Sequence, residues 1–404
     1  MRRISPTTFR IAHRGTSREI NRQIALNLVR LRQPLSRADL ARLMGVRRGA
    51  ISRLVQDLIE SKQIFEGEKG DSKRGRKPQY LFIETRQRCA VAVDITASRT
   101  QILVTDPLGR TLMEISEIPT PAYPPDVIPL LASHINELLQ ADDELGECLG
   151  VGVVVAGIVD TRRGRLRRAP TIGWREVDLR DPLAMATGLP VVVENSVKAC
   201  VLAQLWAVRG LAPVEGPVVF VNASDGVGVG IAIDGQLLRG AHNSAGEFGH
   251  VPLNLNGPWC ACGQRGCWET YVSVGATVAR YLGTDVNWPV SGRPGTTTVQ
   301  IIVARARAGE ARAIETLQQT GEYLGYGLAT VIKAVEPGRI YMSGEITEGW
   351  DLVLPSVRRA LRERALTPEA AECEIAIVPL GDQPRLRVAA ALVTSPAFAA
   401  PVVA

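Results

Sequence analysis

The sequence predicts an α/β protein in which a basic, mainly helical head precedes a larger body of alternating strands and helices. Residues 1–88 contain 21 Lys and Arg against 8 Asp and Glu, whereas the remainder contains 26 against 33. Apolar residues recur at helical spacing in the head and as short strand-length runs after it. The 404 residues, 46% of them hydrophobic, suffice for two or three domains with cores of their own.

Two helices are predicted at the start of the head. The first covers residues 18–32 and ends before Pro34. Its apolar face consists of Ile20, Ile24, Leu28 and Leu31. The second begins at Ser36, whose hydroxyl can cap it with Asp39 as the capping-box partner, and it ends at Gly45.

The third predicted helix has two contrasting faces. Its apolar stripe consists of Ile51, Leu54, Val55, Leu58 and Ile59. Its other face consists of Arg47, Arg48, Ser52, Arg53 and Gln56. A short helix, a glycine turn and a longer helix with such a polar face predict a helix-turn-helix whose third helix enters the DNA major groove. There the arginines can contact guanine edges or phosphates, while Ser52 and Gln56 can read bases.

Two strand-like segments, residues 64–66 and 79–83, flank a long basic tip and complete the head. They predict a β-hairpin, and hence a winged helix-turn-helix domain over residues 1–87, with Arg74 and Arg76 placed to reach phosphates or a minor groove. A merely solvated basic face and a small helical protein-interaction module are the alternatives. Because both the helix and the wing are basic, double-stranded DNA is the favoured partner.

The body alternates between strands and helices after residue 88. The predicted strands are residues 90–95, 100–106, 149–160, 191–195, 217–222 and 340–342. The predicted helices are residues 129–140, 197–208, 273–282, 298–308 and 313–335. Sheets covered by helices follow from this order, and a body of this length usually divides into two lobes with a ligand cleft between them. We assign residues 88–195 and 380–404 to the first lobe and residues 196–379 to the second.

Composition also bears on location and on the seven cysteines. No apolar run reaches the roughly 18 residues of a membrane-spanning helix, and no apolar stretch of a secretory signal follows the first residues. We therefore expect a cytoplasmic protein without a membrane partner. In a reducing compartment the cysteines are expected to be free thiols or metal ligands.

Three cysteines and a histidine are concentrated in one short segment. Cys260, Cys262 and Cys267 lie within eight positions, and His250 lies ten residues before the first of them. Three thiolates and one imidazole make a closed tetrahedral set, which is typical of structural zinc. Free buried cysteines or a disulfide are the alternatives. We predict a structural Zn²⁺ ion at these four residues.

The same segment closely resembles a family signature. Residues 246–250 read GEFGH and residues 260–269 read CACGQRGCWE, a combination similar to that of the ROK family of bacterial repressors, open reading frames and sugar kinases. The resemblance covers essentially the whole chain. It implies an actin-like ATPase fold for the two-lobed body and matches regulator members, which have an N-terminal winged helix-turn-helix.

The resemblance also implies a sugar in the cleft. The matching residues that would bind it are Asn195, Glu247, His250 and Glu269. Thr171 lies in a segment that borders the sugar and replaces an asparagine found in many members. Sugar hydroxyls pair well with carboxylate, amide and imidazole groups. His250 would bind the sugar through one ring nitrogen and zinc through the other.

Three positions depart from the pattern of active kinases in the family. Asn195 is followed by Ser196 instead of an aspartate, and a serine cannot act as the base at neutral pH. The first phosphate turn, Asp-x-Gly-Gly-Thr, becomes residues 94–98 (DITAS), in which Thr96 tolerates a positive φ poorly. The second, Gly-Thr-Gly, becomes residues 224–226 (SDG), with a carboxylate that repels polyphosphate.

These features together predict a sugar-responsive transcriptional repressor of carbohydrate genes that is not an enzyme. Because helix-turn-helix proteins usually read two half-sites, we expect a homodimer or tetramer. Sugar binding would close the lobes and change the spacing of the paired heads. The alternatives are an ATP-dependent sugar kinase with a DNA-binding head and an interaction protein whose cleft has lost its ligand.

Overall fold

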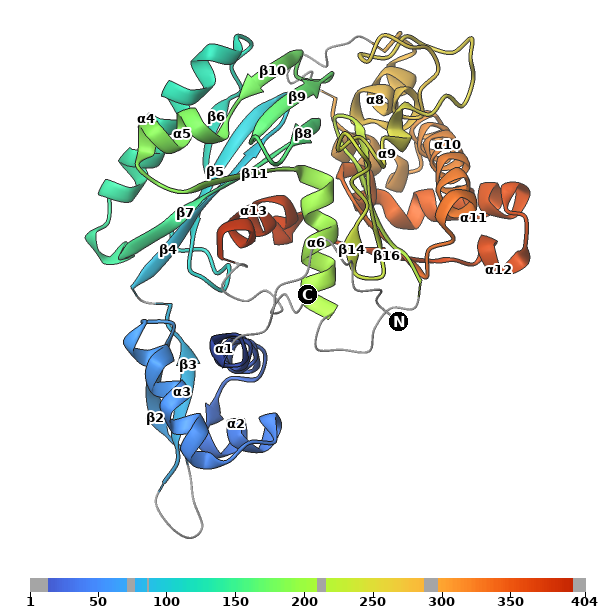
Figure 1. Cartoon of the computed structure of the whole chain (residues 1–404). Coiled ribbons are helices and arrows are strands. Elements are labelled where there is room, and N and C mark those ends of the chain that lie inside the picture. The colour runs from blue at the N-terminus through green and yellow to red at the C-terminus, as the bar shows by residue number, and fades with distance from the viewer. Residues whose placement is uncertain (1–13, 71–76, 86, 209–215, 287–296, 395–404) are drawn as a thin grey trace.

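The computed structural model describes residues 14–70, 77–85, 87–208, 216–286 and 297–394, which form a head and a two-lobed body (Figure 1). Figure 1 shows the head below the body, and Arg88 and Leu108 of the body contact it. Each lobe is built on one five-stranded sheet. Among the described residues, no helix has the length and apolar character required to cross a membrane.

The head contains three helices and a small sheet. The helices are α1 (Arg14–Arg32), α2 (Arg37–Met44) and α3 (Arg48–Glu60). The sheet has the order β1 (Leu35–Ser36), β3 (Gln79–Ile83), β2 (Ile64–Lys69). The predicted capping box is confirmed, since Ser36 Oγ accepts a hydrogen bond from the Asp39 backbone and the Asp39 carboxylate accepts one from the Ser36 backbone. Gly45 ends α2 in the left-handed conformation, as its sequence position indicates.

The buried face of α1 differs from the prediction. Ile24 and Leu31 are 38% and 44% exposed, whereas Ala25, Leu26 and Val29 are buried in the head core. The helix has apolar residues on two neighbouring stripes, and only one of them can face α2 and α3. The spacing of Ile20, Ile24, Leu28 and Leu31 is helical, but it follows the stripe that the head leaves largely uncovered.

The first lobe is a mixed sheet with helices on both faces. Its strand order is β11 (Val191–Asn195), β7 (Glu147–Val155), β4 (Arg88–Ile95), β5 (Arg99–Thr105), β6 (Ser116–Pro119). The apolar residues on one face pack against α4 (Val127–Gln140) and α5 (Arg180–Thr187). Those on the other face pack against α13 (Pro384–Thr394) and α6 (Ser196–Val208).

The predicted strand over residues 149–160 is wrong in its extent, because the chain turns after β7. Gly157 has φ +146°, and a Cβ atom there would lie 2.5 Å from the Arg168 carbonyl oxygen. The chain then forms a separate antiparallel sheet of β8 (Ile158–Asp160), β9 (Arg165–Ala169) and β10 (Trp174–Asp178). The sequence predicted β8 only as the end of the preceding strand, and it did not predict β9 or β10. The turn between β9 and β10 holds residues 170–173.

The second lobe has the strand order β14 (Gln236–Leu237), β13 (Val227–Ile233), β12 (Val218–Ala223), β15 (Arg339–Ser343), β16 (Glu374–Ile377). Its helices are α7 (Glu269–Val272), α8 (Val274–Leu282), α9 (Val299–Arg307), α10 (Ala311–Val335), α11 (Trp350–Arg364) and α12 (Pro368–Ala371). Residues of α6, α13 and both sheets form one shared apolar cluster. Figure 1 shows α6 and α13 between the two sheets.

Candidate functional site

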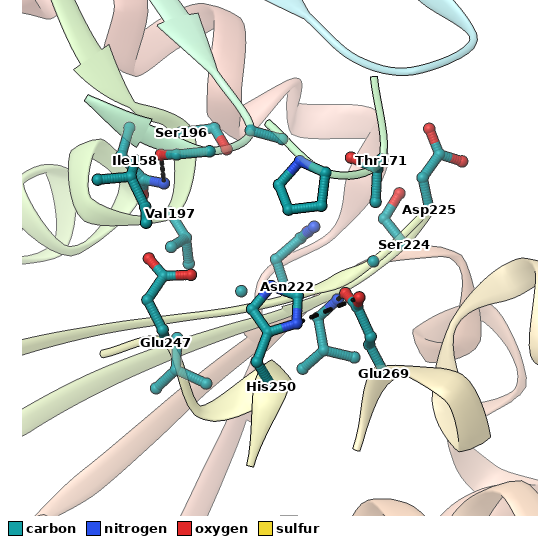
Figure 2. A pocket seen from close by; sticks show the side chains of 18 of the residues that line it. Ile158, Thr171, Ser196, Val197, Asn222, Ser224, Asp225, Glu247, His250 and Glu269 are labelled. Carbon is teal, nitrogen blue, oxygen red and sulfur yellow. Dashed lines mark hydrogen bonds and ion pairs between the residues drawn. The ribbon is translucent and has the colours of Figure 1, made fainter. Parts of the chain in front are cut away.

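A cavity of about 310 Å³ lies between the two lobes (Figure 2). The parallel strands β4, β7 and β11 end at its edge, as is typical of ligand sites in α/β sheets. All five predicted sugar-binding residues line this cavity. They are Asn195 at the end of β11, Thr171 in the β9–β10 turn, Glu247 and His250 after β14, and Glu269 at the start of α7.

Asn195 is held in place by two hydrogen bonds of its own side chain. Its Nδ2 donates to the Gly157 carbonyl at 2.7 Å, and its Oδ1 accepts from the Lys198 backbone at 2.9 Å. The amide therefore fastens the turn after β7 to the first turn of α6. One amide hydrogen and one oxygen lone pair remain for a ligand.

Glu247 has the carboxylate best placed to bind a ligand. Its side chain projects into the cavity in Figure 2, and among the described residues it has no hydrogen-bond partner. Burial raises the pKa of Glu247, while the nearby His250 and Lys198 lower it. Lys198 is itself buried and donates to the Asn243 carbonyl. A half-buried carboxylate that lacks a protein partner is stabilised strongly when a ligand hydroxyl donates a hydrogen bond to it.

The predicted metal ligands form a compact cluster. The donor atoms of His250, Cys260, Cys262 and Cys267 all lie within 4.8 Å of one another. The Cys262 and Cys267 Sγ atoms are 3.6 Å apart, and His250 Nδ1 is 3.6 Å from Cys260 Sγ. Sulfur ligands about 2.3 Å from a tetrahedral zinc lie about 3.7 Å apart. The donor set and its spacing therefore fit one zinc ion.

Glu269 connects the cluster with the cavity. Its Oε1 lies 2.8 Å from Cys260 Sγ and 3.4 Å from His250 Nδ1, as Figure 2 shows for the histidine. Its Oε2 accepts from the Val227 backbone at 3.3 Å. Because His250 uses Nδ1 on the cluster side, its Nε2 is the nitrogen left for a ligand.

The cysteine loop is fixed to both lobes. Trp268 packs into α10, where a Cβ atom on Gly327 would lie 1.9 Å from its indole, and its Nε1 donates to the Tyr323 carbonyl at 3.0 Å. From the first lobe, Arg168 of β9 donates to the Cys262 carbonyl at 2.5 Å. Sequence reasoning missed Arg168, because a single arginine on an unpredicted strand gives no local signal.

The opposite end of the cavity contains a buried ion pair. Arg385 of α13 contacts Asp94 Oδ2 through Nε at 2.8 Å and Nη2 at 2.7 Å. Burial raises the pKa of Asp94, and Arg385 lowers it. Burial also raises the pKa of the nearby Asp225, and the negative charge of Glu345 adds to that rise. Sequence reasoning missed Arg385, which is 291 positions from its partner.

The backbone strain expected at Thr96 is absent from the structure, so that prediction is wrong. Among the described residues Thr96 is not one of those with positive φ, so the turn is not strained there. Its hydroxyl donates to the Arg99 carbonyl at 2.7 Å and accepts from the Arg99 backbone at 3.2 Å. Thr96 therefore closes a tight turn with its own side chain, where the glycine-rich kinase pattern leaves room for phosphate.

The predicted recognition face of α3 is exposed. The guanidinium groups of Arg47, Arg48 and Arg53 have no ion-pair or hydrogen-bond partner within the described part of the chain. Ser52 Oγ donates to the Arg48 carbonyl at 3.1 Å, and Gln56 donates to Glu60 at 3.1 Å, so both polar groups are engaged within the helix. Arg74 and Arg76 lie outside the described residues.

The two-lobed α/β body, with a ligand cleft and a cysteine-rich loop beside it, has the architecture of sugar kinase-like proteins. The model of the ROK family matches residues 90–395, so the chain belongs to the ROK family. It is 27% identical to a xylose repressor of Bacillus subtilis over 88% of this chain and 89% of that protein. It is also 27% identical to the repressor Mlc of Escherichia coli over 82% of each.

Kinases of the family match the body. A glucokinase of Streptomyces coelicolor is 29% identical over 67% of this chain and 86% of its own length. Among solved structures, a ROK transcriptional regulator homologous to Mlc has TM-score 0.76 at 24% identity and covers 95% of this chain and 98% of its own. A ROK glucokinase from Streptomyces griseus in complex with glucose and AMPPNP has TM-score 0.62 at 28% identity and covers 75% of this chain and 98% of its own.

Proposed function

We propose that the chain is a sugar-responsive transcriptional repressor whose ROK body binds a sugar without phosphorylating it. The observation that carries this proposal is the combination, in one chain, of an unpartnered arginine face on α3 and a cleft that lacks the catalytic aspartate after Asn195. The match to the xylose repressor spans 88% of this chain, which is longer than the body, so it includes part of the head. The glucokinase match spans 67%.

The head acts as a winged helix-turn-helix, with residues 1–87 as the DNA-binding domain. The exposed guanidinium groups of Arg47, Arg48 and Arg53 bind phosphates or guanine edges of operator DNA, with Ser52 and Gln56 beside them. Arg74 and Arg76, which lie outside the described residues, contribute further contacts to phosphates or a minor groove. The protein acts as a homodimer or tetramer, because paired heads match the two half-sites of an operator.

The sugar binds between a first lobe of residues 88–195 and 380–404 and a second lobe of residues 196–379. Glu247 and His250 Nε2 bind hydroxyl groups from the second lobe. Asn195 and Thr171 bind them from the first lobe, and Glu269 completes the set. A ligand bound by both lobes makes more contacts when the lobes are closed than when they are open. It therefore favours the closed arrangement.

A structural Zn²⁺ ion organises the loop that holds His250 and Glu269. Cys260, Cys262 and Cys267 supply thiolates and His250 supplies Nδ1, which leaves no coordination position for catalysis. The ion therefore fixes the orientation of a sugar-binding imidazole. Through Arg168 the same loop is bonded to the first lobe, which links metal, sugar and lobe closure.

The first two strands of the body connect the cleft with the head. Thr96 and Ala97, at the turn between β4 and β5, line the cavity. At the other end, Arg88 donates to the Ser61 carbonyl of the head at 3.4 Å, and Leu108 packs against the head core. The β4–β5 hairpin contacts the cleft at one end and the head at the other. Closure of the lobes can therefore change the orientation of the DNA-binding head through this hairpin.

Phosphoryl transfer does not suit this cleft. Ser196 cannot serve as the base, Asp225 presents a carboxylate where polyphosphate would lie, and Asp94 is occupied by Arg385. The kinase alternative makes an opposite prediction. Steady ATP consumption that depends on an added sugar would overturn the proposal, and it can be measured with a panel of monosaccharides in a coupled assay.

The sugar site is tested with a Glu247→Gln variant. We expect one or more monosaccharides to raise the melting temperature of the zinc-loaded protein, because a ligand stabilises the fold that binds it. The variant should bind that sugar about 10- to 100-fold more weakly, the loss of one charge-assisted hydrogen bond of about 1.5–3 kcal/mol. Calorimetry measures the affinity, and Glu144→Gln, at an exposed carboxylate outside the cleft, is the matched control. Equal affinities would remove Glu247 from the site.

The DNA-binding face is tested with an Arg53→Ala variant. Loss of one guanidinium contact should weaken operator binding about 10- to 100-fold, since a good base contact is worth about 1–3 kcal/mol. Sugar affinity should stay unchanged, because α3 is far from the cleft along the chain and belongs to the head. An electrophoretic mobility shift assay measures the affinity for operator DNA, and calorimetry measures the affinity for sugar. Loss of both activities would indicate misfolding and contradict the division of roles.

A further inference from the structure

Two cysteines outside the metal cluster face each other on neighbouring strands. Cys89 is the second residue of β4 and Cys148 the second residue of β7, and the parallel register pairs them. Paired strands lie about 4.8 Å apart, within the range of about 4.4–6.8 Å that a disulfide spans between Cα atoms. Both side chains belong to the apolar cluster beneath α4 and α5, so they project from the same face of the sheet.

The two thiols differ in the direction of their pKa shifts and in their exposure. A hydrogen bond from Cys89, helped by backbone groups of Gly150 and Val91, lowers the pKa of Cys148 to about 7 against the effect of burial. The same hydrogen bond, together with burial, raises the pKa of Cys89. Cys148 is partly exposed, whereas Cys89 is fully buried. A reachable thiolate beside a second thiol is the arrangement that peroxides oxidise selectively.

The pair lies where the head joins the body. Arg88, next to Cys89, donates to the Ser61 carbonyl of the head and forms a 3.5 Å ion pair with Glu147, next to Cys148. The Glu147 backbone donates to the Gln87 carbonyl at 2.9 Å. The register between β4 and β7 shifts just after Cys89, so the regular ladder is interrupted beside the pair.

We propose that Cys89 and Cys148 form a reversible disulfide when the protein meets a peroxide. The Cys148 thiolate attacks one peroxide oxygen, which breaks the O–O bond, gives a sulfenic acid on Cys148 and releases hydroxide, which takes a proton to become water. The Cys89 thiol then attacks the sulfenic sulfur, the S–S bond forms, and a second water leaves. The two sulfurs lose two electrons, and the peroxide is reduced to two waters. A dithiol reductant reverses the reaction.

The disulfide ties the first residues of β4 to β7 beside the contact between Arg88 and the head. This consequence rests on the proposed function: oxidation resets the angle or mobility of the DNA-binding head. We expect operator affinity to change by about fivefold or more, the lower end of typical coupling between sites.

The test uses the full-length, zinc-loaded protein treated with hydrogen peroxide, blocked with an alkylating reagent and digested without reduction. We expect mass spectrometry to find a peptide pair linked through Cys89 and Cys148, and dithiothreitol to separate it. Cys148→Ser should lack the link, whereas Cys373→Ser, at a cysteine outside both groups, should form it. In Cys89→Ala, a dimedone adduct should accumulate on Cys148. Oxidation confined to Cys260, Cys262 and Cys267 would overturn the proposal.

The functional arm measures binding of a DNA fragment from upstream of the protein's own gene before and after oxidation. A change that dithiothreitol reverses and that Cys148→Ser abolishes supports the coupling. If the linked peptide is found but DNA affinity is unchanged, the proposed effect of oxidation on DNA binding is wrong, while the disulfide between Cys89 and Cys148 is supported. If the reduced wild type fails to bind any such fragment, the failure belongs to the proposed function, while peptide mapping still decides on the thiol pair.

Discussion

A Cys260→Ala variant is expected to lose its metal and its response to sugar together. Cys260 Sγ lies 3.6 Å from His250 Nδ1 and 2.8 Å from Glu269 Oε1, so it adjoins two residues that the proposed sugar contacts. Removal of one of four ligands opens the tetrahedral site, and the binding free energy of a structural zinc, about 10–16 kcal/mol in small domains, is also folding free energy. The loop should then lose its fixed shape.

The measurement is metal content after dialysis, paired with the sugar-induced shift in melting temperature. The wild type should retain one zinc per chain and the variant close to none. Cys373→Ser is the matched control, because its thiol lies outside the cluster and contacts the Pro337 carbonyl. A variant that keeps full zinc content would exclude Cys260 as a ligand. A variant that loses zinc yet responds normally to sugar would separate the two sites.

The parts of the molecule that were predictable are those with a local signal. Cys260, Cys262 and Cys267 stand close together in the chain, and the structure gathers them with His250 into one cluster. Ser36, Asp39 and Gly45 mark the ends of α2 through contacts that span only a few residues. Apolar runs of strand length identified β4, β5, β12 and β15, because a buried strand needs apolar residues on both faces.

Features that depend on distant contacts were not predictable in this way. The α1 sequence has two apolar stripes, and the tertiary packing of α2 and α3 decides which one is buried. The strands β9 and β10 are short and contain arginines, so their pattern resembles a loop, and β8 was merged with the apolar run of β7. Arg168 and Arg385 reach their partners only after the lobes have folded, and neither has a neighbour in sequence that indicates its role.

The Arg385→Met variant should lower the stability of the body severely. Asp94 is 3% exposed, its Oδ2 pairs with Arg385, and its Oδ1 has no hydrogen-bond partner among the described residues. Methionine retains much of the side-chain volume but leaves a buried carboxylate without a counterion. Breaking a buried pair in this way costs about 3–5 kcal/mol, which corresponds to a drop of about 10 °C in melting temperature for a domain of this size.

The pH dependence and a second variant identify charge as the cause. Without Arg385, burial still raises the pKa of Asp94 and only the charge of Arg99 remains to lower it, so the pKa in the folded state rises further above the unfolded value. A group with a raised folded pKa destabilises the fold as pH increases, so the defect should be smaller at about pH 5 than at about pH 8. Asp94→Asn combined with Arg385→Met removes both charges and should recover most of the loss. A single variant as stable as the wild type, or a double variant no better than the single, would show that the pair does not hold this end of the cleft. Recovery in the double variant would mean that Arg385 stabilises this end of the cleft mainly by neutralising Asp94.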